Sequence, residues 1–135
     1  MKFCCGVTLY YPSQEEINNV LMYSKIFDHV YIFDNTDSHA YRKNRENFKN
    51  KKDITYISFG ENKGLSVAYN SMCDLAIENE FDYICLLDQD SSVHNEDFEK
   101  IKNKIYIDNK KNVAIYVPKI VYKHKEYKMK NDNND

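Results

Sequence analysis

Two aspartates, Asp88 and Asp90, are separated by one residue and directly follow the apolar run 83–87. Side chains alternate along a strand, so carboxylates at positions i and i+2 point to the same side. Two carboxylates that lie so close repel each other unless a cation joins them. Mg²⁺ or Mn²⁺ suits them because both ions prefer oxygen ligands. The spacing therefore predicts a divalent-metal site at Asp88 and Asp90, and the alternative is a polar loop whose acids cap the next helix.

Two further polar clusters follow apolar runs. Asp34 ends the run that begins at residue 29, and Lys63 and Gly64 follow the run 54–59. Ligands of open parallel sheets bind at the carboxyl ends of the strands, where these clusters would converge with the aspartate pair. Each cluster also has a plainer interpretation, because Asp34 and Gly64 are common turn residues and Lys63 suits a solvated loop.

Two other polar side chains lie on or beside predicted helices. Asn70 belongs to the helical pattern that begins at Leu65, and it either reaches the metal loop or serves packing. His94 follows Asp90 by four residues and is either a further metal ligand or a polar residue at a helix entry. The helix start at Leu65 would leave backbone N–H groups free, which favours an anion nearby.

A sheet with flanking helices is needed to bring these side chains together. Five apolar runs predict strands, at residues 3–10, 29–33, 54–59, 83–87 and 113–117. Helical periodicity predicts helices within the segments 13–24, 65–76 and 95–105, and the polar stretch 39–53 suits a loop with a short helix. The alternation predicts an α/β domain with a mainly parallel sheet of about five strands flanked by helices.

The first predicted helix has a clear start signal. Ser13 and Glu16 have the spacing of a capping box. The buried face of this helix is expected to hold Ile17, Val20, Leu21 and Ser24.

The composition is that of a folded domain. The 135 residues suffice for one domain, with 42% hydrophobic and 30% charged residues and only 3 Gly and 2 Pro. No run approaches the roughly 20 apolar residues of a membrane-spanning helix, and the N-terminus is typical of a strand rather than a signal peptide. The four cysteines lack a CxxC spacing, so we expect buried reduced thiols and a cytoplasmic protein.

Charge is divided unevenly along the chain. Residues 1–99 hold 9 Lys and Arg against 17 Asp and Glu, a net −8, whereas residues 100–135 hold 10 Lys against 4 acids, a net +6. A nucleic-acid-binding face usually needs Arg, and the chain has only Arg42 and Arg45, so we expect no nucleic-acid partner. The Lys-rich end either is solvated or contacts a partner or a membrane surface, which would place the protein at the inner face of the membrane.

Four motifs occur in a characteristic order, at residues 7–12 (VTLYYP), 33–35 (FDN), 61–70 (ENKGLSVAYN) and 86–91 (LLDQDS). In this order and at these spacings they resemble family 2 glycosyltransferases. They are most similar to the rhamnosyltransferase-like branch, in which D-Q-D-S and E-N-x-G-x-x-x-A-x-N occur together. The resemblance covers about residues 3–121.

The resemblance implies a GT-A fold, in which a Rossmann-like nucleotide-binding half precedes an acceptor-binding half. It also implies an activity in polysaccharide biosynthesis: metal-assisted, inverting transfer of a sugar from a nucleoside-diphosphate sugar (a dTDP- or UDP-sugar) to a saccharide or lipid-linked acceptor. By the same resemblance, Thr8, Tyr10 and Pro12 would line the nucleotide pocket after the first strand. Asp34 would form a hydrogen bond with the base.

The remaining candidates would surround the diphosphate and the metal. The resemblance implies that Lys63 and Gly64 lie beside the nucleotide, and it groups Asn70 with the residues that bind the nucleotide sugar. Asp88 would approach the ribose and the metal, and Asp90 would be the principal ligand of Mn²⁺ or Mg²⁺. A metal there would act as a Lewis acid on the diphosphate leaving group, and Lys63 would add positive charge.

The sequence departs from the family pattern at its C-terminal end. In this family the catalytic base is an Asp or Glu beyond the fifth strand, and no acid of the Lys-rich end has a matching context. We therefore expect residues 1–122 to form a truncated nucleotide-sugar-binding domain and 123–135 a polar Lys/Asn-rich tail. The alternative function is a non-catalytic nucleotide-sugar-binding module. For a glycosyltransferase, a homo-oligomer or a second subunit would supply the acceptor half.

Overall fold

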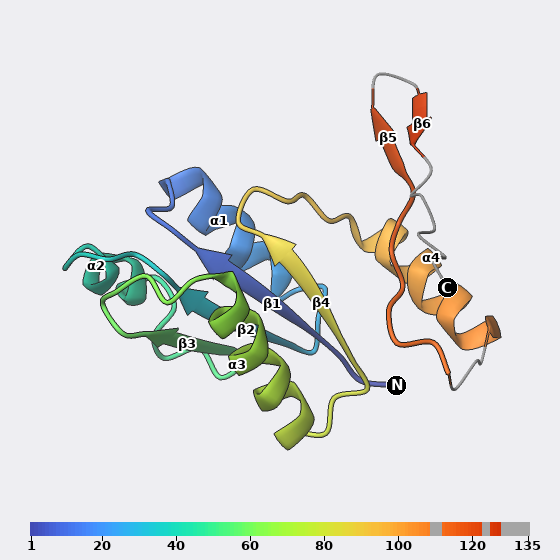
Figure 1. Cartoon of the computed structure of the whole chain (residues 1–135), viewed down its shortest axis with the longest axis horizontal. Coiled ribbons are helices and arrows are strands. Elements are labelled where there is room, and N and C mark those ends of the chain that lie inside the picture. The colour runs from blue at the N-terminus through green and yellow to red at the C-terminus, as the bar shows by residue number, and fades with distance from the viewer. Residues whose placement is uncertain (109–111, 123–124, 128–135) are drawn as a thin grey trace, which may run out of the picture. The chain divides into compact units, whose positions relative to one another are not determined.

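The structure, a computed structural model, contains a four-stranded, all-parallel sheet with the strand order β3-β2-β1-β4 (Figure 1). The structure describes residues 1–108, 112–122 and 125–127. The chain forms two units, Met1–Ile101 and Lys102–Asp135, and the sheet belongs to the first. Along the chain the elements are β1 (Phe3–Leu9), α1 (Gln14–Tyr23), β2 (His29–Asp34), α2 (Tyr41–Glu46), β3 (Ile54–Ser58), α3 (Leu65–Glu78), β4 (Tyr83–Asp88) and α4 (Asn95–Asp108).

The α/β class and the first four predicted strands are confirmed. The predicted capping box at the start of α1 is also present: Ser13 Oγ accepts the Glu16 N–H at 3.1 Å, and Glu16 Oε1 accepts the Ser13 N–H at 2.9 Å. The buried face of α1 differs from the prediction. Its buried residues are Ile17, Val20 and Tyr23, so Tyr23 takes the place expected for Leu21 and Ser24.

The two faces of the sheet are covered by different helices. Helix α1 connects β1 to β2 and α2 connects β2 to β3, so both connections run in the same direction across the sheet, whereas α3 connects β3 back to β4 at the other edge. Because connections between parallel strands are right-handed, α3 lies on the opposite face from α1 and α2. In Figure 1, α3 crosses in front of the sheet and α1 lies behind it. The buried cluster on the α3 face consists of Cys4, Tyr31, Phe33, Ala68, Met72 and Ala76. Strand residues of the other parity fill the opposite face, among them Val7, Leu9, Val30 and Ile32.

Gly6 allows α3 to lie close to the centre of the sheet. A Cβ at this position would lie 3.1 Å from each of Met72 Sδ, Ile84 Cδ1 and Leu86 Cδ2. These distances are tighter than ordinary van der Waals contact, so a side chain at Gly6 would push on both α3 and β4. The absence of a side chain here therefore sets the distance between the sheet and the helix.

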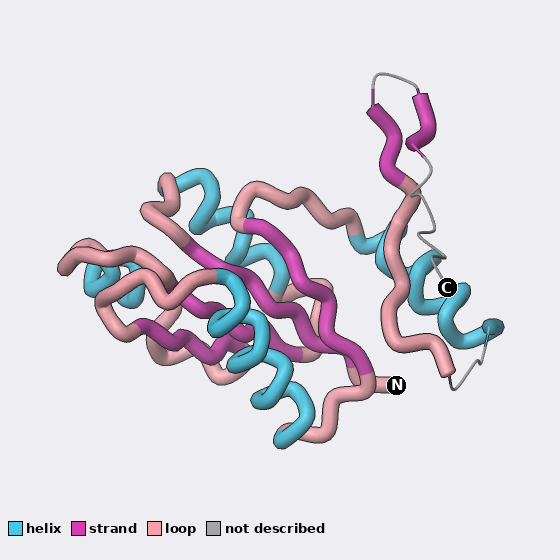
Figure 2. The backbone as a smooth tube through the Cα atoms, in the orientation of Figure 1, coloured by secondary structure: helices cyan, strands magenta, loops and turns pink. Residues whose placement is uncertain are grey.

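The predicted fifth strand is wrong. Residues 113–119 form neither strand nor helix (Figure 2), and Ile115 and Val117 are largely exposed. In the described part of the second unit, β5 (Ile120–Tyr122) and β6 (Lys125–Tyr127) instead pair with each other in an antiparallel hairpin. An apolar run becomes a strand only where a neighbouring backbone can pair with it, and Pro118 removes a donor directly after this run. Of the predicted tail, residues 123–124 and 128–135 lie outside the described residues.

The four cysteines are free thiols, but the predicted burial holds only for two of them. Cys4 and Cys5 are buried, and Cys73 and Cys85 are half-buried. Burial raises the pKa of Cys4 to about 12 and the pKa of Cys5 well above its ordinary value, so both thiols stay protonated and inert at neutral pH. Among the described residues, no helix combines the length and apolar character needed to cross a membrane.

Candidate functional site

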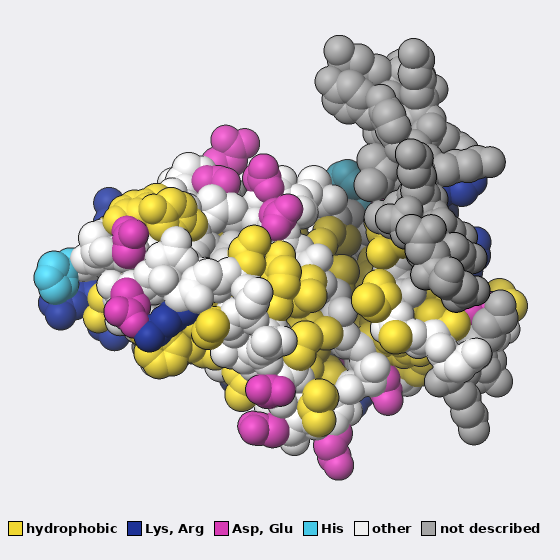
Figure 3. Space-filling model, viewed as in Figure 1, with side chains coloured by type: hydrophobic (Ala, Val, Ile, Leu, Met, Phe, Trp, Pro, Cys, Tyr) yellow, Lys and Arg dark blue, Asp and Glu magenta, His cyan; other side chains and the backbone are white. Residues whose placement is uncertain are grey.

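The predicted metal residues lie in a tight turn at the carboxyl end of β4. Asp88 is the last residue of the strand, and its carbonyl accepts the Ser91 N–H at 3.0 Å, which closes a four-residue turn. Strand alternation therefore ends at Asp88, and the spacing argument for Asp90 fails because Asp90 lies in the turn. Both side chains are exposed, and neither carboxylate has a hydrogen bond or ion pair within the described part of the chain. Figure 3 shows acidic side chains gathered over α1 and the end of β4.

Gln89, between the two aspartates, ties this turn to the loop after β1. Its Oε1 accepts the Tyr10 N–H at 2.9 Å, and its Nε2 donates to the Tyr10 carbonyl at 3.3 Å. The same Nε2 donates to Glu16 Oε2 at 3.0 Å, so the capping-box carboxylate also contacts the turn. The backbone N–H of Ser13 and the amide of Gln89 both hold the pKa of Glu16 below its ordinary value.

Two side chains of α1 bind the backbone of the same turn. Asn19 Nδ2 donates to the Gln89 carbonyl at 3.1 Å and to the Ser91 carbonyl at 2.7 Å. The Tyr23 hydroxyl donates to the Ser91 carbonyl and lies 3.2 Å from the Asp88 carbonyl. The turn is therefore fixed through its carbonyl groups, which leaves both aspartate side chains uncommitted.

Thr8 lies beside Asp88 in the sheet. Its Cα pairs with that of Asp88 in β4 and with that of Phe33 in β2. Paired residues of neighbouring strands project to the same face, so Thr8 and Asp88 share the face to which Phe33 and α3 belong. Thr8 Oγ1 is the one buried side-chain polar atom of the described residues without a hydrogen-bond partner. Leaving such an atom unpaired costs about 1–3 kcal/mol.

Two adjacent aromatic residues follow β1. Tyr10 and Tyr11 are 49% and 47% exposed, and their rings pack edge to face with centroids 4.8 Å apart. Tyr11 has a positive φ of 42°, which its N–H bond to Thr36 Oγ1 (3.0 Å) and its hydroxyl bond to Asp37 Oδ1 (2.6 Å) hold in place. The half-buried Pro12 comes next. This loop is therefore ordered while it leaves the Tyr10 ring open to a flat ligand.

Asp34 is fully buried, and its carboxylate is already occupied. Oδ1 accepts the Thr36 N–H at 2.9 Å, and Oδ2 accepts Asn44 Nδ2 at 3.0 Å and the Tyr56 hydroxyl at 2.5 Å. Burial and the bond to Asp34 raise the pKa of Tyr56 far above its ordinary value. In this structure Asp34 organises the loop that follows β2, and its contact with a base stays a prediction.

The loop that carries Lys63 and Gly64 is tied to the end of β2 by the buried Asn35. Asn35 Oδ1 accepts the Lys63 N–H at 3.0 Å, and its Nδ2 donates to the Gly64 carbonyl at 3.3 Å. Gly64 has a φ of 83°, and no atom lies within 4 Å of a Cβ built there, so backbone conformation rather than space favours glycine. The Lys63 ammonium pairs with Glu61 and lies 5.4 Å from the ring centroid of Phe59.

The N-terminus of α3 lies at the same edge of the sheet. Its N-cap is Gly64, so the helix has no side-chain cap, and Leu65 in its first turn is exposed. The first backbone N–H groups of a helix lack partners within the helix and carry a partial positive charge. Asn70, in the second turn of α3, is exposed.

Comparison with known families decides the classification. The profile of Glycosyl transferase family 2 matches residues 14–134. The chain belongs to glycosyltransferase family 2. The matched segment includes Asp34, Lys63, Gly64, Asn70, Asp88 and Asp90 and begins after Thr8, Tyr10 and Pro12.

A solved structure shares this fold. The crystal structure of S. aureus TarS 1–349 is 19% identical in sequence and superposes with a TM-score of 0.55, covering 79% of this chain and 33% of the TarS chain. At this identity the likeness shows the fold alone, and it confirms the Rossmann-like GT-A class with four strands rather than five in the sheet. The chain spans about a third of that TarS structure. No curated protein matches the sequence.

The two aspartates of this family 2 chain suit a metal ion that takes its other ligands from a bound phosphate and water. The described residues contain no group of three or more His, Cys, Asp or Glu side chains that could hold an ion, so His94 does not complete a site with Asp88 and Asp90. Mg²⁺ is commonly held by one or two carboxylates together with substrate phosphate oxygens and water. The donor set therefore suits Mg²⁺ or Mn²⁺ that binds together with a phosphate group.

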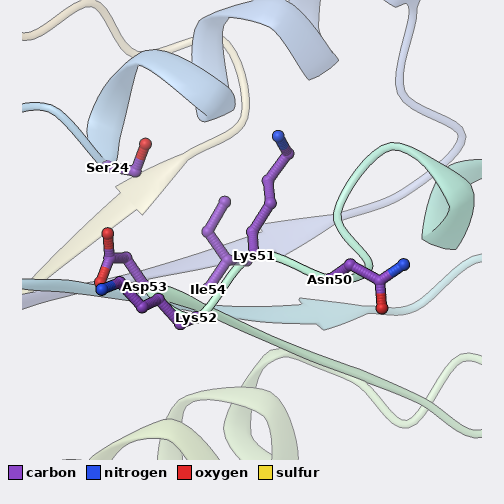
Figure 4. Close-up of a pocket in the computed structure, with 6 residues that line it drawn as sticks. All are labelled: Ser24, Asn50, Lys51, Lys52, Asp53 and Ile54. Atoms are coloured by element: carbon purple, nitrogen blue, oxygen red, sulfur yellow. The ribbon is translucent and has the colours of Figure 1, made fainter.

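Two open hollows lie in the unit Met1–Ile101. One, of about 510 Å³, lies at the start of β3 and is lined by Ser24, Asn50, Lys51, Lys52, Asp53 and Ile54 (Figure 4). The other, of about 430 Å³, is lined by Asp37, Ser38, His39, Tyr41, Arg42, Phe59 and Gly60. None of the predicted site residues lines either hollow.

Four side chains that shape this edge were not predicted as site residues: Asn19, Tyr23, Asn35 and Gln89. Asn35 and Gln89 lie inside the recognised motifs, so the motifs themselves were a signal for them. Asn19 and Tyr23 lie in an ordinary amphipathic helix, where nothing in the pattern indicated contacts with a turn about 70 residues away.

Proposed function

We propose that residues 1–122 bind a nucleoside-diphosphate sugar at the carboxyl edge of the sheet, as the donor site of an inverting, metal-assisted glycosyl transfer. UDP- and dTDP-sugars are the proposed donors, with hexosyl or rhamnosyl transfer to a saccharide or lipid-linked acceptor. The observation that carries this proposal is the Asp88–Ser91 turn, whose two carboxylates are exposed and uncommitted beside the unpartnered Thr8 hydroxyl.

Asp88 and Asp90 would hold a divalent metal together with the diphosphate of the donor. Breaking the anomeric bond leaves negative charge on the diphosphate, and a bound metal supplies Lewis-acid stabilisation of that charge. Asp90, in the turn, is the proposed principal ligand, and Asp88, at the end of β4, lies between it and Thr8. Because neither carboxylate makes a hydrogen bond or ion pair with another described residue, neither has to give up such a partner when the metal arrives.

The other edge residues would surround the nucleotide. The Thr8 hydroxyl would bond a polar atom of the nucleotide, while Tyr10 and Pro12 would form one wall. The uncapped N-terminus of α3 after Gly64 favours phosphate oxygens. Lys63 would have to exchange its partner Glu61 for the diphosphate, which is an inexpensive exchange for an exposed ion pair.

Two predicted residues have narrower proposed roles. Asn70 is exposed in the second turn of α3 and is proposed to contact the sugar or the metal turn. Asp34 would reach the base only if one of its three internal donors were displaced.

Calorimetric titration of the chain with UDP and dTDP, with and without Mn²⁺, tests the donor site. We expect metal-dependent binding of at least one nucleotide and an affinity loss of about tenfold or more in Asp90→Asn, because one charged ligand is lost. Asp74→Asn is the matched control, since Asp74 is an exposed aspartate in the second half of α3. If neither nucleotide binds in a metal-dependent way, or both variants behave alike, the donor site is refuted.

Turnover is measured separately, as release of UDP or dTDP from the sugar nucleotides with saccharide and lipid-linked acceptors. Nucleotide binding with turnover identifies a glycosyltransferase. Binding without turnover under every acceptor identifies the alternative, a non-catalytic nucleotide-sugar-binding module. Turnover that appears only when a second subunit supplies the acceptor half would identify a glycosyltransferase.

The proposed location is the cytoplasm, at the inner face of the membrane. The Lys-rich net charge of +6 in residues 100–135 favours contact with anionic lipids. Cosedimentation with vesicles that contain anionic lipid, but not with neutral vesicles, is the expected result.

A further inference from the structure

We infer that Asn19 and Tyr23 of α1 are positioning residues for the metal turn, the segment Asp88–Ser91, because they bind the backbone of this turn while the side chains of Asp88 and Asp90 stay exposed. This inference rests on the proposed donor site. It concerns how the turn is ordered before any ligand arrives.

The contacts of these two residues converge on one short stretch of backbone. Asn19 Nδ2 lies 3.1 Å from the Gln89 carbonyl and 2.7 Å from the Ser91 carbonyl. The Tyr23 hydroxyl lies 3.2 Å from the Asp88 carbonyl and also donates to the Ser91 carbonyl. Three of the four carbonyls of the turn are therefore bound from a helix that is separated from it by about 70 residues.

Three hydrogens serve the five contacts of these two side chains, so some of the hydrogens are shared between acceptors. The Asn19 amide has two hydrogens, and the Tyr23 hydroxyl has one. Asn19 Nδ2 is also 3.0 Å from the Tyr23 oxygen, so the two side chains support each other one turn apart on α1. Burial raises the pKa of Tyr23 to about 12, so the hydroxyl keeps its proton throughout the neutral range.

Gln89 completes the arrangement from the other side of the turn. Its amide bonds both the N–H and the carbonyl of Tyr10, and it also donates to Glu16, the carboxylate of the α1 capping box. The turn is thus held by its carbonyls and by its central side chain. The two carboxylates are the parts left free.

A positioning role for Asn19 and Tyr23 differs from ordinary packing in its effect on metal binding. A metal held by two carboxylates and a phosphate needs both carboxylates in place at once, and a mobile turn would lose conformational freedom when the metal binds. Pre-ordering of the turn removes that loss from the binding step. A nucleotide that binds without metal does not need the two carboxylates, so its affinity should not depend on the turn.

Tyr23→Phe and Asn19→Ala test the inference with matched controls. Tyr31→Phe removes the hydroxyl of a tyrosine that is buried to a similar extent and bonds the Leu75 carbonyl on the α3 face, at 3.5 Å. Asn18→Ala removes the exposed neighbour of Asn19, whose side chain bonds only Gln14 within the described residues. Each variant is titrated with UDP and dTDP, with and without Mn²⁺, and hydrogen exchange is followed in the peptide that contains the turn.

We expect Tyr23→Phe to weaken metal-dependent nucleotide binding about tenfold, equivalent to about 1.4 kcal/mol, while metal-free affinity stays within about twofold. Hydrogen exchange in the turn should accelerate without any ligand, and the control variants should leave both quantities unchanged. If Tyr23→Phe does not fold, Asn19→Ala decides by the same criteria.

Unchanged exchange in the turn would overturn the inference, as would an equal loss of metal-free and metal-dependent affinity. Failure of the proposed function has a different signature, because the wild-type chain itself would then show no metal-dependent binding. In that case faster exchange in Tyr23→Phe would still establish that α1 orders the turn, and the role toward a metal would be refuted.

Discussion

Replacement of Asp34 by alanine should destabilise the sheet-containing unit by about 2–4 kcal/mol, whereas Asp34→Asn should cost only about 1 kcal/mol. The carboxylate is fully buried at the end of β2 and accepts bonds from Thr36, Asn44 and Tyr56. The comparison asks whether this residue organises the loop after β2, as its contacts indicate.

The magnitude follows from what each donor loses. The buried Thr36 N–H would be left without an acceptor, at about 1–3 kcal/mol, and Asn44 Nδ2 would keep only its longer contact of 3.4 Å with Thr36 Oγ1. The Tyr56 hydroxyl retains the Tyr41 carbonyl at 3.1 Å, so its loss is smaller. In Asp34→Asn the amide oxygen still accepts the Thr36 N–H, and the Tyr56 hydroxyl can turn to accept instead of donate. The Asn44 amide, which donates to Oδ2 in the wild type, would have to rotate and present its oxygen to the new Nδ2.

Urea unfolding followed by circular dichroism measures the difference. With an m-value of about 2 kcal/mol/M, the midpoint should fall by about 1–2 M in Asp34→Ala and by about 0.5 M in Asp34→Asn. Asp37→Ala is the control, because Asp37 lies in the same loop but is exposed, and it should change stability by about 1 kcal/mol or less. If Asp34→Ala is as stable as Asp34→Asn, the three bonds do not contribute as argued and the reasoning fails.

Three further substitutions have definite expected outcomes. Thr8→Val removes an unpartnered buried hydroxyl, so it should raise the thermal midpoint of the free chain while weakening nucleotide binding; a lower midpoint would contradict the argument. Gly6→Val places atoms against Met72, Ile84 and Leu86, so it should cost about 1–3 kcal/mol in urea unfolding, and an unchanged midpoint would show that α3 yields freely. Burial lowers the pKa of His29 in the folded chain, against the opposing charge of Asp53, so the folded state binds fewer protons than the unfolded state near pH 6. The contribution of His29 to the stability of the folded chain is complete above its ordinary pKa of about 6.5 and is lost as the pH falls through the lowered pKa. Between about pH 7.5 and about pH 5, the thermal midpoint of His29→Gln should therefore fall less than that of the wild type. Equal falls would refute the lowered pKa of His29.

The sheet was predictable because its strands are short, continuously apolar runs that end at polar turn residues. In β2 and β4 the runs stop at Asp34 and Asp88, where the structure also ends the strands. Periodicity alone could not decide the segment 113–117, which has the same apolar character but no partner strand. Strand formation depends on pairing with a neighbour, and pairing is a property of the fold rather than of one segment.

The sequence predicted which edge of the sheet carries the candidate site residues, but not the contacts that each residue makes there. Parallel topology brings Thr8, Lys63 and Asp88 to the carboxyl ends of their strands or to the loop that follows, as the topology rule requires. The pattern could not reveal that Asp34 is saturated by internal donors, because two of those donors come from α2 and β3 and meet it only in the folded chain. A motif aspartate can therefore be structural even when its neighbours in the same motif are exposed.

The contacts of α1 with the turn after β4 could not be predicted from helical periodicity. Tyr23 counts as one more buried position on an amphipathic helix, at 1% exposure, and Asn19 as one of several polar residues between apolar ones. Their roles arise because β4 enters the sheet next to β1, which brings the turn after β4 against the first helix. The same helix starts with the carboxylate of Glu16, which Gln89 also bonds. The unit of β1 and α1 therefore does more than complete the core, because it also fixes the turn that carries both aspartates. A change that unwinds the start of α1 should therefore loosen this turn.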